Sequence, residues 1–214
     1  MLWKHIIGVY DKDMQNELRR ATKLTYHHVH LNSYSVMKVN LAAQVMSMSV
    51  SKIMQEYGGD EASETAKFVS MIDRFFACMN VRSLSESLRK RKPDLMPYTS
   101  LEDPRFKFLL GDFLGYLNEW KNEVESKEGF KKTQKSKMFL STQTFKGLVM
   151  RTHAVAEATQ FLLGSGVSFV LTNKFCQDPV EEHFGHRRAL GRRNENPTVY
   201  QFGYQENKLR QQRS

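Results

Sequence analysis

Apolar residues recur at three- and four-residue steps over residues 36–57, which is the pattern of one buried helical face. Gly58-Gly59 then provides a helix stop, and Asp60 can cap a second helix that follows. We expect the phenylalanine and methionine side chains of both helices to form core rather than a cofactor site. The two apolar stripes comprise Val39, Ala42, Met46, Val50, Ile53, Tyr57, Phe68, Val69, Ile72, Phe75, Phe76 and Met79.

Helical patterning continues through most of the remaining chain. Further helices are predicted over residues 13–24, 103–124 and 142–162. Pro104 suits the first turn of one of them, and Ser141 or Thr142 can cap another. Residues 82–99 are polar and basic, and they predict a loop that can contact phosphate.

The pattern changes after residue 166. Residues 168–172 are β-branched and aromatic, and they predict a single buried strand. A new helix is predicted from Asp178-Pro179, and the Arg-, Asn- and Gln-rich residues from 191 onward are expected to pack poorly. The elements together predict a mainly α chain with one short strand near its C-terminal end.

The composition indicates which classes of partner the chain can bind, but it does not identify one. The formal charge is +9 and the sequence pI about 9.5, which favours nucleic acid first and an acidic membrane surface second. A solubilising surface charge is an equally good explanation. No apolar run approaches the roughly 20 residues that a membrane span needs. Cys78 and Cys176 belong to no CxxC pair or Cys/His cluster, so neither a disulfide framework nor a zinc site is indicated.

Charge runs also suggest how the chain is divided. The lysine-rich residues 127–137 predict an exposed linker and the main internal boundary. We therefore expect a helical domain over residues 1–137, a second part over 138–190, and a basic, poorly packed tail over 191–214. Apolar sequence begins directly at residue 1, without a polar lead-in, which suggests that the chain starts inside a domain.

The acidic segment over residues 177–185 admits two interpretations. Asp178 and Glu181 stand in the first turn of the predicted helix, on either side of Pro179, where they can form a capping box. A carboxylate in a first turn can also face a site and bind Mg²⁺ when neighbouring strands supply further carboxylates. Two-metal phosphoryl transfer needs several oxygen ligands, so one carboxylate alone cannot support it.

Residues 177–185 resemble the QDxxExxFG-like signature that closes the catalytic domain of P-element-type transposases. Residues 23–31, 37–47 and 196–202 match the same family in the same order, so the resemblance covers nearly the whole chain. It implies a helical GTP-binding insertion domain followed by the C-terminal strand and helix portion of an RNase H-like α/β catalytic domain.

In that family a D-D-E triad binds Mg²⁺, and the helical domain is inserted before the final Glu. The resemblance therefore implies that Glu181 is a catalytic residue and Mg²⁺ ligand, and that Asp178 lies beside the site, where GTP can approach. It also implies DNA at transposon ends as the substrate, a homo-oligomer with full-length transposase, and a nuclear location. No membrane association is expected.

The sequence departs from the family pattern in three ways. Ala77, within Phe75 to Asn80, stands where the family has an Asp, so GTP binding is in doubt if that Asp contacts the guanine. The two triad Asp residues belong upstream of the insertion and are not found here, and neither is the family's zinc-coordinating DNA-binding domain. No GxxxxGK[ST] loop is present, so a nucleotide site here would differ from a P-loop. We expect this chain alone not to be catalytically competent.

Basic and histidine residues supply the remaining candidates. DNA contact is expected at the arginines that follow the acidic helix, although a solvated basic face explains them equally well. These arginines are Arg187, Arg188, Arg192 and Arg193. His27, His28 and His30 are clustered, but without Cys or carboxylate at ligand spacing a metal site is the less favoured explanation.

Three functions from different classes remain open at this stage. The chain is a fragment of a cut-and-paste DNA transposase, a domesticated or decayed DNA-binding protein without catalysis, or a nucleotide-binding helical module. The first two share a fold and differ in the upstream Asp residues. Tight GTP binding without DNA binding would favour the third.

Overall fold

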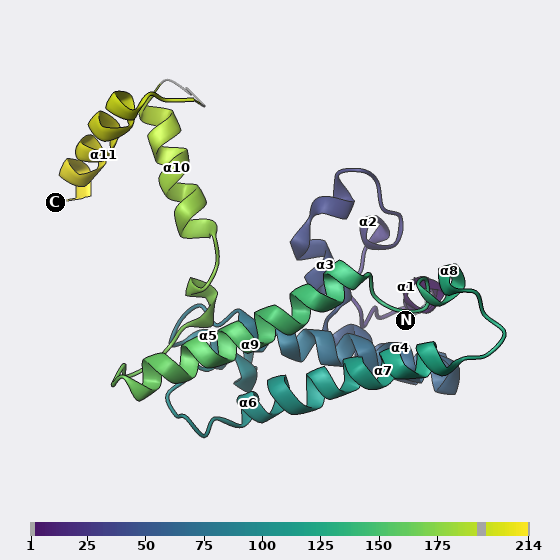
Figure 1. The fold of residues 1–214 in the computed structure, drawn as a ribbon. Helices are drawn as coiled ribbons and strands as arrows, with labels where there is room; N and C mark the ends of the chain where they lie inside the picture. The colour runs from purple at the N-terminus through teal and green to yellow at the C-terminus, as the bar shows by residue number, and fades with distance from the viewer. Residues whose placement is uncertain (1–2, 192–195, 214) are drawn as a thin grey trace. The chain divides into compact units, whose positions relative to one another are not determined.

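The computed structural model describes residues 3–191 and 196–213, which are almost entirely helical (Figure 1). The prediction of a mainly α chain is confirmed. The chain forms two compact units, one up to Thr172 and one from Asn173 onward. The predicted boundary between residues 137 and 138 lies inside the first unit and stays a prediction. No helix of the described part is long and apolar enough to cross a membrane.

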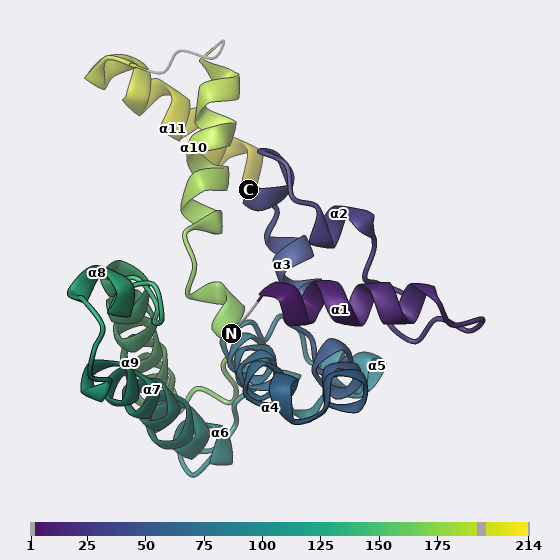
Figure 2. The ribbon, with the colours of Figure 1, turned by 90° about the vertical axis from the view of Figure 1, so that its right-hand side faces the viewer.

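The first unit begins with a small core between two helices. α1 (Trp3–Met14) packs on α4 (Met48–Met79), and the chain between them folds over the same core (Figure 2). Three short helices make up that covering segment: α2 (Tyr26–Val29), the 3₁₀ turn η1 (Ser35–Met37) and α3 (Val39–Val45). The buried side chains include Ile6, Val9, Leu24, Val45, Ile53, Met54 and Val69.

The predicted stop at Gly58-Gly59 is present as a kink inside one long helix. Gly59 has φ 54° and ψ −151°, a conformation that only glycine adopts readily, and the helix resumes directly after it. At Gly58 an added Cβ would lie 2.3 Å from Cβ of Ala62, so a side chain there would collide with the next turn. The glycine pair thus redirects α4 without ending it.

The predicted helix over residues 13–24 is wrong. α1 ends at Met14, and the segment that follows is a loop that folds back onto Asp13. The fully buried Asp13 carboxylate accepts hydrogen bonds from the amides of Arg20 (2.8 Å) and Ala21 (3.1 Å). These long-range bonds satisfy loop amides that a continuing helix would have bonded internally, so they favour the loop over local helical propensity.

The middle of the unit matches the prediction over residues 103–124. The helix starts at Pro104, with Oδ1 of Asp103 accepting from the Arg105 amide at 3.0 Å, and it contains one π-helical stretch. Its parts are α6 (Pro104–Lys107), the π segment η3 (Phe108–Phe113) and α7 (Leu114–Ser126). The basic stretch before it is mainly loop, with the short helices α5 (Glu86–Lys90) and η2 (Pro93–Leu95).

Aromatic contacts tie α4, α7 and α9 together. α9 (Thr142–Gly164) begins as predicted, with the Ser141 hydroxyl accepting from the Thr144 amide at 3.1 Å, and it follows the short α8 (Lys132–Lys135). Ring centroids lie 5.6 Å apart for Phe68 and Trp120, 4.9 Å for Trp120 and Phe139, and 5.3 Å for Phe139 and Phe145. This series of edge-on rings runs from α4 through α7 to α9.

The predicted strand over residues 168–172 is wrong. The described residues contain one isolated antiparallel bridge, in which Val170 and Tyr98 exchange backbone hydrogen bonds of 2.8 and 3.1 Å. Pro97 has no N–H to extend the ladder, and the chain turns into the 3₁₀ segment η4 (Thr172–Lys174) directly after the bridge. The residues have strand-forming character but lack a partner strand.

The second unit is a helical hairpin of α10 (Asp178–Leu190) and α11 (Val199–Arg213). The tail over residues 191–214, expected to pack poorly, includes the helix α11, and most of the described side chains of α11 are exposed. Leu209 and Gln205 of α11 are buried, and Arg187 of α10 lies against the Phe202 ring at 3.2 Å from its centroid. A few side chains therefore order a segment whose composition is mostly polar.

Candidate functional site

An exposed apolar loop links α2 to α3 in the first unit. Tyr34 is 84% exposed, Met37 81% and Val39 69%, although apolar side chains normally avoid water. Asn32 fixes the loop, because its Oδ1 accepts from the amides of Tyr34 (3.0 Å) and Ser35 (2.8 Å). The apolar side chains are thus presented to solvent by a braced turn.

Lys38 lies among these apolar side chains and is itself exposed. In the part of the chain that the structure describes, its ammonium group has no ion-pair partner. A cation beside exposed apolar side chains suits a ligand that has both a flat apolar face and an anionic group. We define residues 31–39 as the apolar loop.

His28 anchors the start of the apolar loop. Its Nδ1 accepts from the Thr25 amide at 3.0 Å, and its Nε2 lies 2.6 Å from Oε1 of Gln44, so the neutral Nε2–H form satisfies both contacts. His28 is buried, whereas His27 and His30 flank Tyr26, with the His30 ring stacked on it at 4.1 Å. His28 therefore has a packing and hydrogen-bonding role, and His27 and His30 contact the Tyr26 ring.

The end of α4 carries the residues that depart from the family pattern. Phe75 is buried and stacks on Phe113 at 4.4 Å, whereas Phe76 is 40% exposed. Ala77 is only 1% exposed, so the methyl group at this position belongs to the packed interior. An Asp at position 77 in this conformation would place its carboxylate close to that interior.

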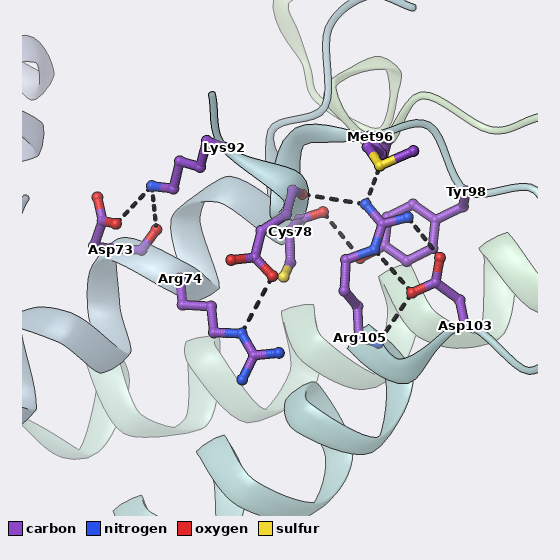
Figure 3. Close-up of polar contacts among 9 residues, drawn as sticks. Asp73, Arg74, Cys78, Lys92, Met96, Tyr98, Asp103 and Arg105 are labelled. Atoms are coloured by element: carbon purple, nitrogen blue, oxygen red, sulfur yellow. Dashed lines mark hydrogen bonds and ion pairs between the residues drawn. The ribbon is translucent and has the colours of Figure 1, made fainter. Parts of the chain in front are cut away.

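Beyond α4, a buried arginine organises the loop over residues 94–98 (Figure 3). The Arg105 guanidinium donates to the carbonyls of Asp94 (3.1 Å), Met96 and Pro97 (3.2 Å). It also makes a two-point contact with Asp103, at 2.8 and 2.6 Å, and lies 3.6 Å from the centroid of the Tyr98 ring. All three guanidinium nitrogens donate hydrogen bonds, so Arg105 acts as a structural clamp.

Charge and burial shift the pKa values of groups around this clamp. Burial disfavours ionisation of Asp103, but the hydrogen bonds from Arg105 outweigh it and hold the pKa of this carboxyl below its usual value. Burial raises the pKa of the Cys78 thiol to about 12, so the thiol stays protonated and unreactive at neutral pH. Neither group is poised for acid–base chemistry.

The Cys78 carbonyl joins the clamp to the segment that leads to the acidic motif. It accepts from the Tyr98 hydroxyl (3.2 Å) and from the Thr172 hydroxyl (2.9 Å). Thr172 Oγ1 in turn accepts from the Val81 amide at 3.1 Å. The end of α4 thereby holds the last residue of the first unit, nine positions before Glu181.

Two of the predicted carboxylates lie at the start of α10. Glu181 is exposed, and its amide donates to the Gln177 carbonyl at 2.9 Å. The side chain of Asp178 lies outside the described residues, so its predicted role is neither supported nor opposed. Among the residues that the structure does describe, no group of three or more His, Cys, Asp or Glu side chains is arranged to hold a metal ion. The described residues therefore do not form a Mg²⁺ site by themselves.

The four predicted DNA-contacting arginines differ in their surroundings. Arg187 is 3% exposed, and it is occupied by Phe202 and by Glu206, whose Oε2 lies 3.9 Å from its Nε. Arg188 is exposed. Arg192 and Arg193 lie outside the described residues. The hairpin thus uses Arg187 for its own packing and leaves Arg188 free to meet a partner.

Two features of the fold were missed by sequence reasoning. The bonding of Arg105 could have been suspected from Asp103-Pro104-Arg105, where the cap and a cation are two residues apart, but its three carbonyl partners depend on the tertiary fold. The predicted single helix over residues 36–57 is wrong at its start: η1, α3 and the beginning of α4 replace it, and Val39 and Ala42 are exposed although the pattern placed them on a buried face.

Comparison with known proteins places these features in a family. Residues 1–92 match the family described as "TNP-like, GTP-binding insertion domain". The transposable element P transposase of Drosophila melanogaster is 24% identical over 199 residues, which are 89% of this chain and 24% of that protein. The chain thus spans about a quarter of the length of this relative.

A solved structure has the same fold. The Drosophila P element transposase in a strand transfer complex aligns with a TM-score of 0.67 and 22% identity, over 96% of this chain and 44% of that one. The apolar loop and the end of α4 both lie within the residues that match the insertion-domain family. The resemblance expected from four short motifs is confirmed.

Proposed function

We propose that this chain, which is similar to P-element-type transposases, binds a guanine nucleotide through its N-terminal helical part. The observation that carries the proposal is the match of residues 1–92 to a family of GTP-binding insertion domains. These residues contain no P-loop, so recognition must rely on a different arrangement of side chains.

The apolar loop is our proposed contact surface for the nucleotide. Exposed Val39 and Met37 offer an apolar face for a base, and Lys38 offers a cation for the phosphates. Asn32 and His28 hold the loop in place, which lowers the entropy that binding must remove. The last three residues of the loop, 37–39, belong to a sequence stretch that matches the family, residues 37–47.

Ala77 affects how strongly the nucleotide binds and not where on the chain it binds. Without a carboxylate at this position the chain lacks one acceptor for the guanine edge, if the family Asp serves that purpose. The buried position of Ala77 also means that Ala77→Asp must reorganise the end of α4 before it can contact a ligand. We therefore expect GTP to bind, with weaker discrimination against ATP than a carboxylate would give.

Charge reversal at Lys38 tests the proposed surface. Lys38→Glu should weaken GTP binding by about tenfold or more, because a phosphate would then face a carboxylate. Lys52→Glu is the matched control, since Lys52 is an exposed lysine of the same domain outside the apolar loop. If both variants lost GTP affinity equally, or if neither lost any, the nucleotide would not bind at this loop.

For catalysis, we propose that Glu181 serves as one carboxylate of a Mg²⁺ site that is completed by residues outside this chain. Mg²⁺ would activate the attacking oxygen and stabilise the leaving oxygen in phosphoryl transfer, and Glu181 would hold the ion. One carboxylate alone cannot hold both ions of a two-metal site, so we expect that this chain alone does not cleave DNA. Mg²⁺-dependent cleavage of transposon-end DNA by the purified chain, lost in Glu181→Gln, would contradict it.

DNA binding without catalysis is the second candidate function. It is favoured by the net charge of +9 and by the exposure of Arg188, which lies on the same helix as Glu181. We expect salt-sensitive binding of duplex DNA, because each phosphate contact releases counterions, and a shallower salt dependence in Arg188→Ala. Affinity that did not change between low and physiological salt would count against this proposal.

A further inference from the structure

A pocket lies outside residues 1–92, which match the insertion-domain family. It has a volume of about 460 Å³ and opens between the end of α7, α8 and the start of α9. Its floor is apolar and is formed by Val124, Phe139, Leu140 and Phe145. Pockets of about 300–1,000 Å³ with apolar linings are typical binding sites for small ligands or anchor side chains.

The rim of this pocket is basic. Lys121, Lys132, Lys135 and Lys146 line it, against the single acidic residue Glu125. Two of the lysines are engaged: Lys121 lies 3.8 Å from the Glu125 carboxylate, and Lys135 donates to the Glu125 carbonyl at 2.7 Å. Within the described residues, Lys132 and Lys146 have no acidic partner, and both are exposed. Two cations are thus available beside an apolar floor.

The charge of the rim is a local property rather than a reflection of the basic chain as a whole. A neighbouring pocket shares Val124 but is lined by three glutamates, Glu64, Glu119 and Glu123, and by two lysines, Lys67 and Lys127. α7 thus separates a surface of mixed charge from a basic one. A ligand chosen by charge would therefore distinguish the two pockets.

We propose that the basic pocket binds an acidic peptide segment of a partner protein, through one apolar anchor side chain that is flanked by carboxylates. The anchor would pack on Phe139 and Phe145, and the carboxylates would pair with Lys132 and Lys146. The pocket is open on one side, so the peptide backbone stays outside while the anchor enters.

Charge and shape both favour a peptide over nucleic acid here. The two available lysines border one concave apolar pocket, whereas single-stranded DNA needs cations that follow its backbone over several nucleotides. The Glu125 carboxylate, which is 64% exposed at the rim, would repel a phosphate chain that passed over it. A single anchor residue can avoid Glu125 by its orientation.

A labelled synthetic peptide, with one tryptophan between short runs of glutamate, tests the proposal by fluorescence anisotropy on the full chain. The double variant Lys132→Glu and Lys146→Glu should weaken binding by about tenfold or more, since two favourable contacts become repulsive. The matched control reverses Lys52 and Lys107, two exposed lysines away from the pocket, and should change binding by less than about twofold. Circular dichroism checks that both double variants keep the helical content of the native chain.

Replacing the tryptophan of the peptide by serine separates anchoring from charge. The proposal expects the serine peptide to bind at least about tenfold more weakly, because the apolar floor then loses its partner. Equal binding of both peptides, or equal loss in the two double variants, would overturn the proposal. So would binding of an oligothymidylate in place of the peptide, if it were lost in the pocket variant alone.

Discussion

At the scale of single residues, the first unit depends on polar groups that are buried and fully bonded. Arg105 alone satisfies three carbonyls and one carboxylate, and Asp13 and Thr172 perform the same task for loop amides. Buried groups of this kind are costly only when a partner is removed. Their loss should therefore affect stability more than the loss of any surface charge.

Arg105→Ala should lower the free energy of unfolding by about 3 kcal/mol, because it removes the guanidinium donors from the Asp103 carboxylate and from the carbonyls of Asp94, Met96 and Pro97. Urea denaturation followed by circular dichroism measures this change. Arg89→Ala is the control, since Arg89 is exposed on α5 and should change stability by less than about 0.5 kcal/mol. Similar small effects for both variants would refute the clamp.

The depressed pKa of Asp103 predicts a loss of stability in acid. Its carboxylate contributes stability above the unfolded-state pKa of 3.8, and that contribution disappears as the pH falls through the lower folded-state value. The difference in unfolding free energy between the native chain and Asp103→Asn should therefore shrink as the pH is lowered below 3.8. If this difference stayed constant from neutral pH to acid, the stabilising effect of Asp103 would not depend on ionisation of its carboxyl group.

At the scale of elements, the long helix α4 is shaped by its glycine pair. The N-terminal core takes side chains from both sides of the kink at Gly59, Ile53 before it and Val69 after it, and further along α4 Phe75 packs on Phe113. The φ of 54° and ψ of −151° lie in a region that a residue with a Cβ occupies only under strain.

Gly59→Ala should destabilise the chain by about 1–3 kcal/mol, although no atom lies within 4 Å of the added Cβ. The cause is backbone strain rather than steric crowding. Gly115→Ala is the matched control: Gly115 is helical within α7 and equally uncrowded, so alanine there should stabilise by about 0.5–1 kcal/mol. Thermal unfolding of both variants measures the two effects. A change in stability of the same sign in both variants would contradict the conformation at Gly59.

At the scale of the whole molecule, periodicity predicted the long helices well. α4, the helix from Pro104, and α9 with its Ser141 cap follow from apolar spacing and local capping chemistry. The failures arise from hydrogen-bond partners that helical and strand periodicity does not encode. Asp13 draws residues 15–24 into a loop, and Val170 meets only Tyr98 where a strand was expected.

The candidate site was predictable only in part. Motif matches identified the family and directed attention to residues 37–47 and to Glu181. They could not show that Tyr34, Met37 and Val39 are held in solvent, or that Arg187 packs within its own hairpin, because exposure is decided by the fold as a whole. The basic pocket combines residues from three elements and has no local signature in the sequence.

Isothermal titration of the native chain with GTP, and in parallel with ATP, tests the central claim most directly. We expect saturable binding of GTP, with a preference over ATP that is smaller than a carboxylate at position 77 would give. Ala77→Asp, measured beside it, should sharpen this preference if the folded end of α4 accommodates the carboxylate. Absence of any GTP binding by the native, folded chain would contradict the assignment of residues 1–92 as a working nucleotide-binding domain.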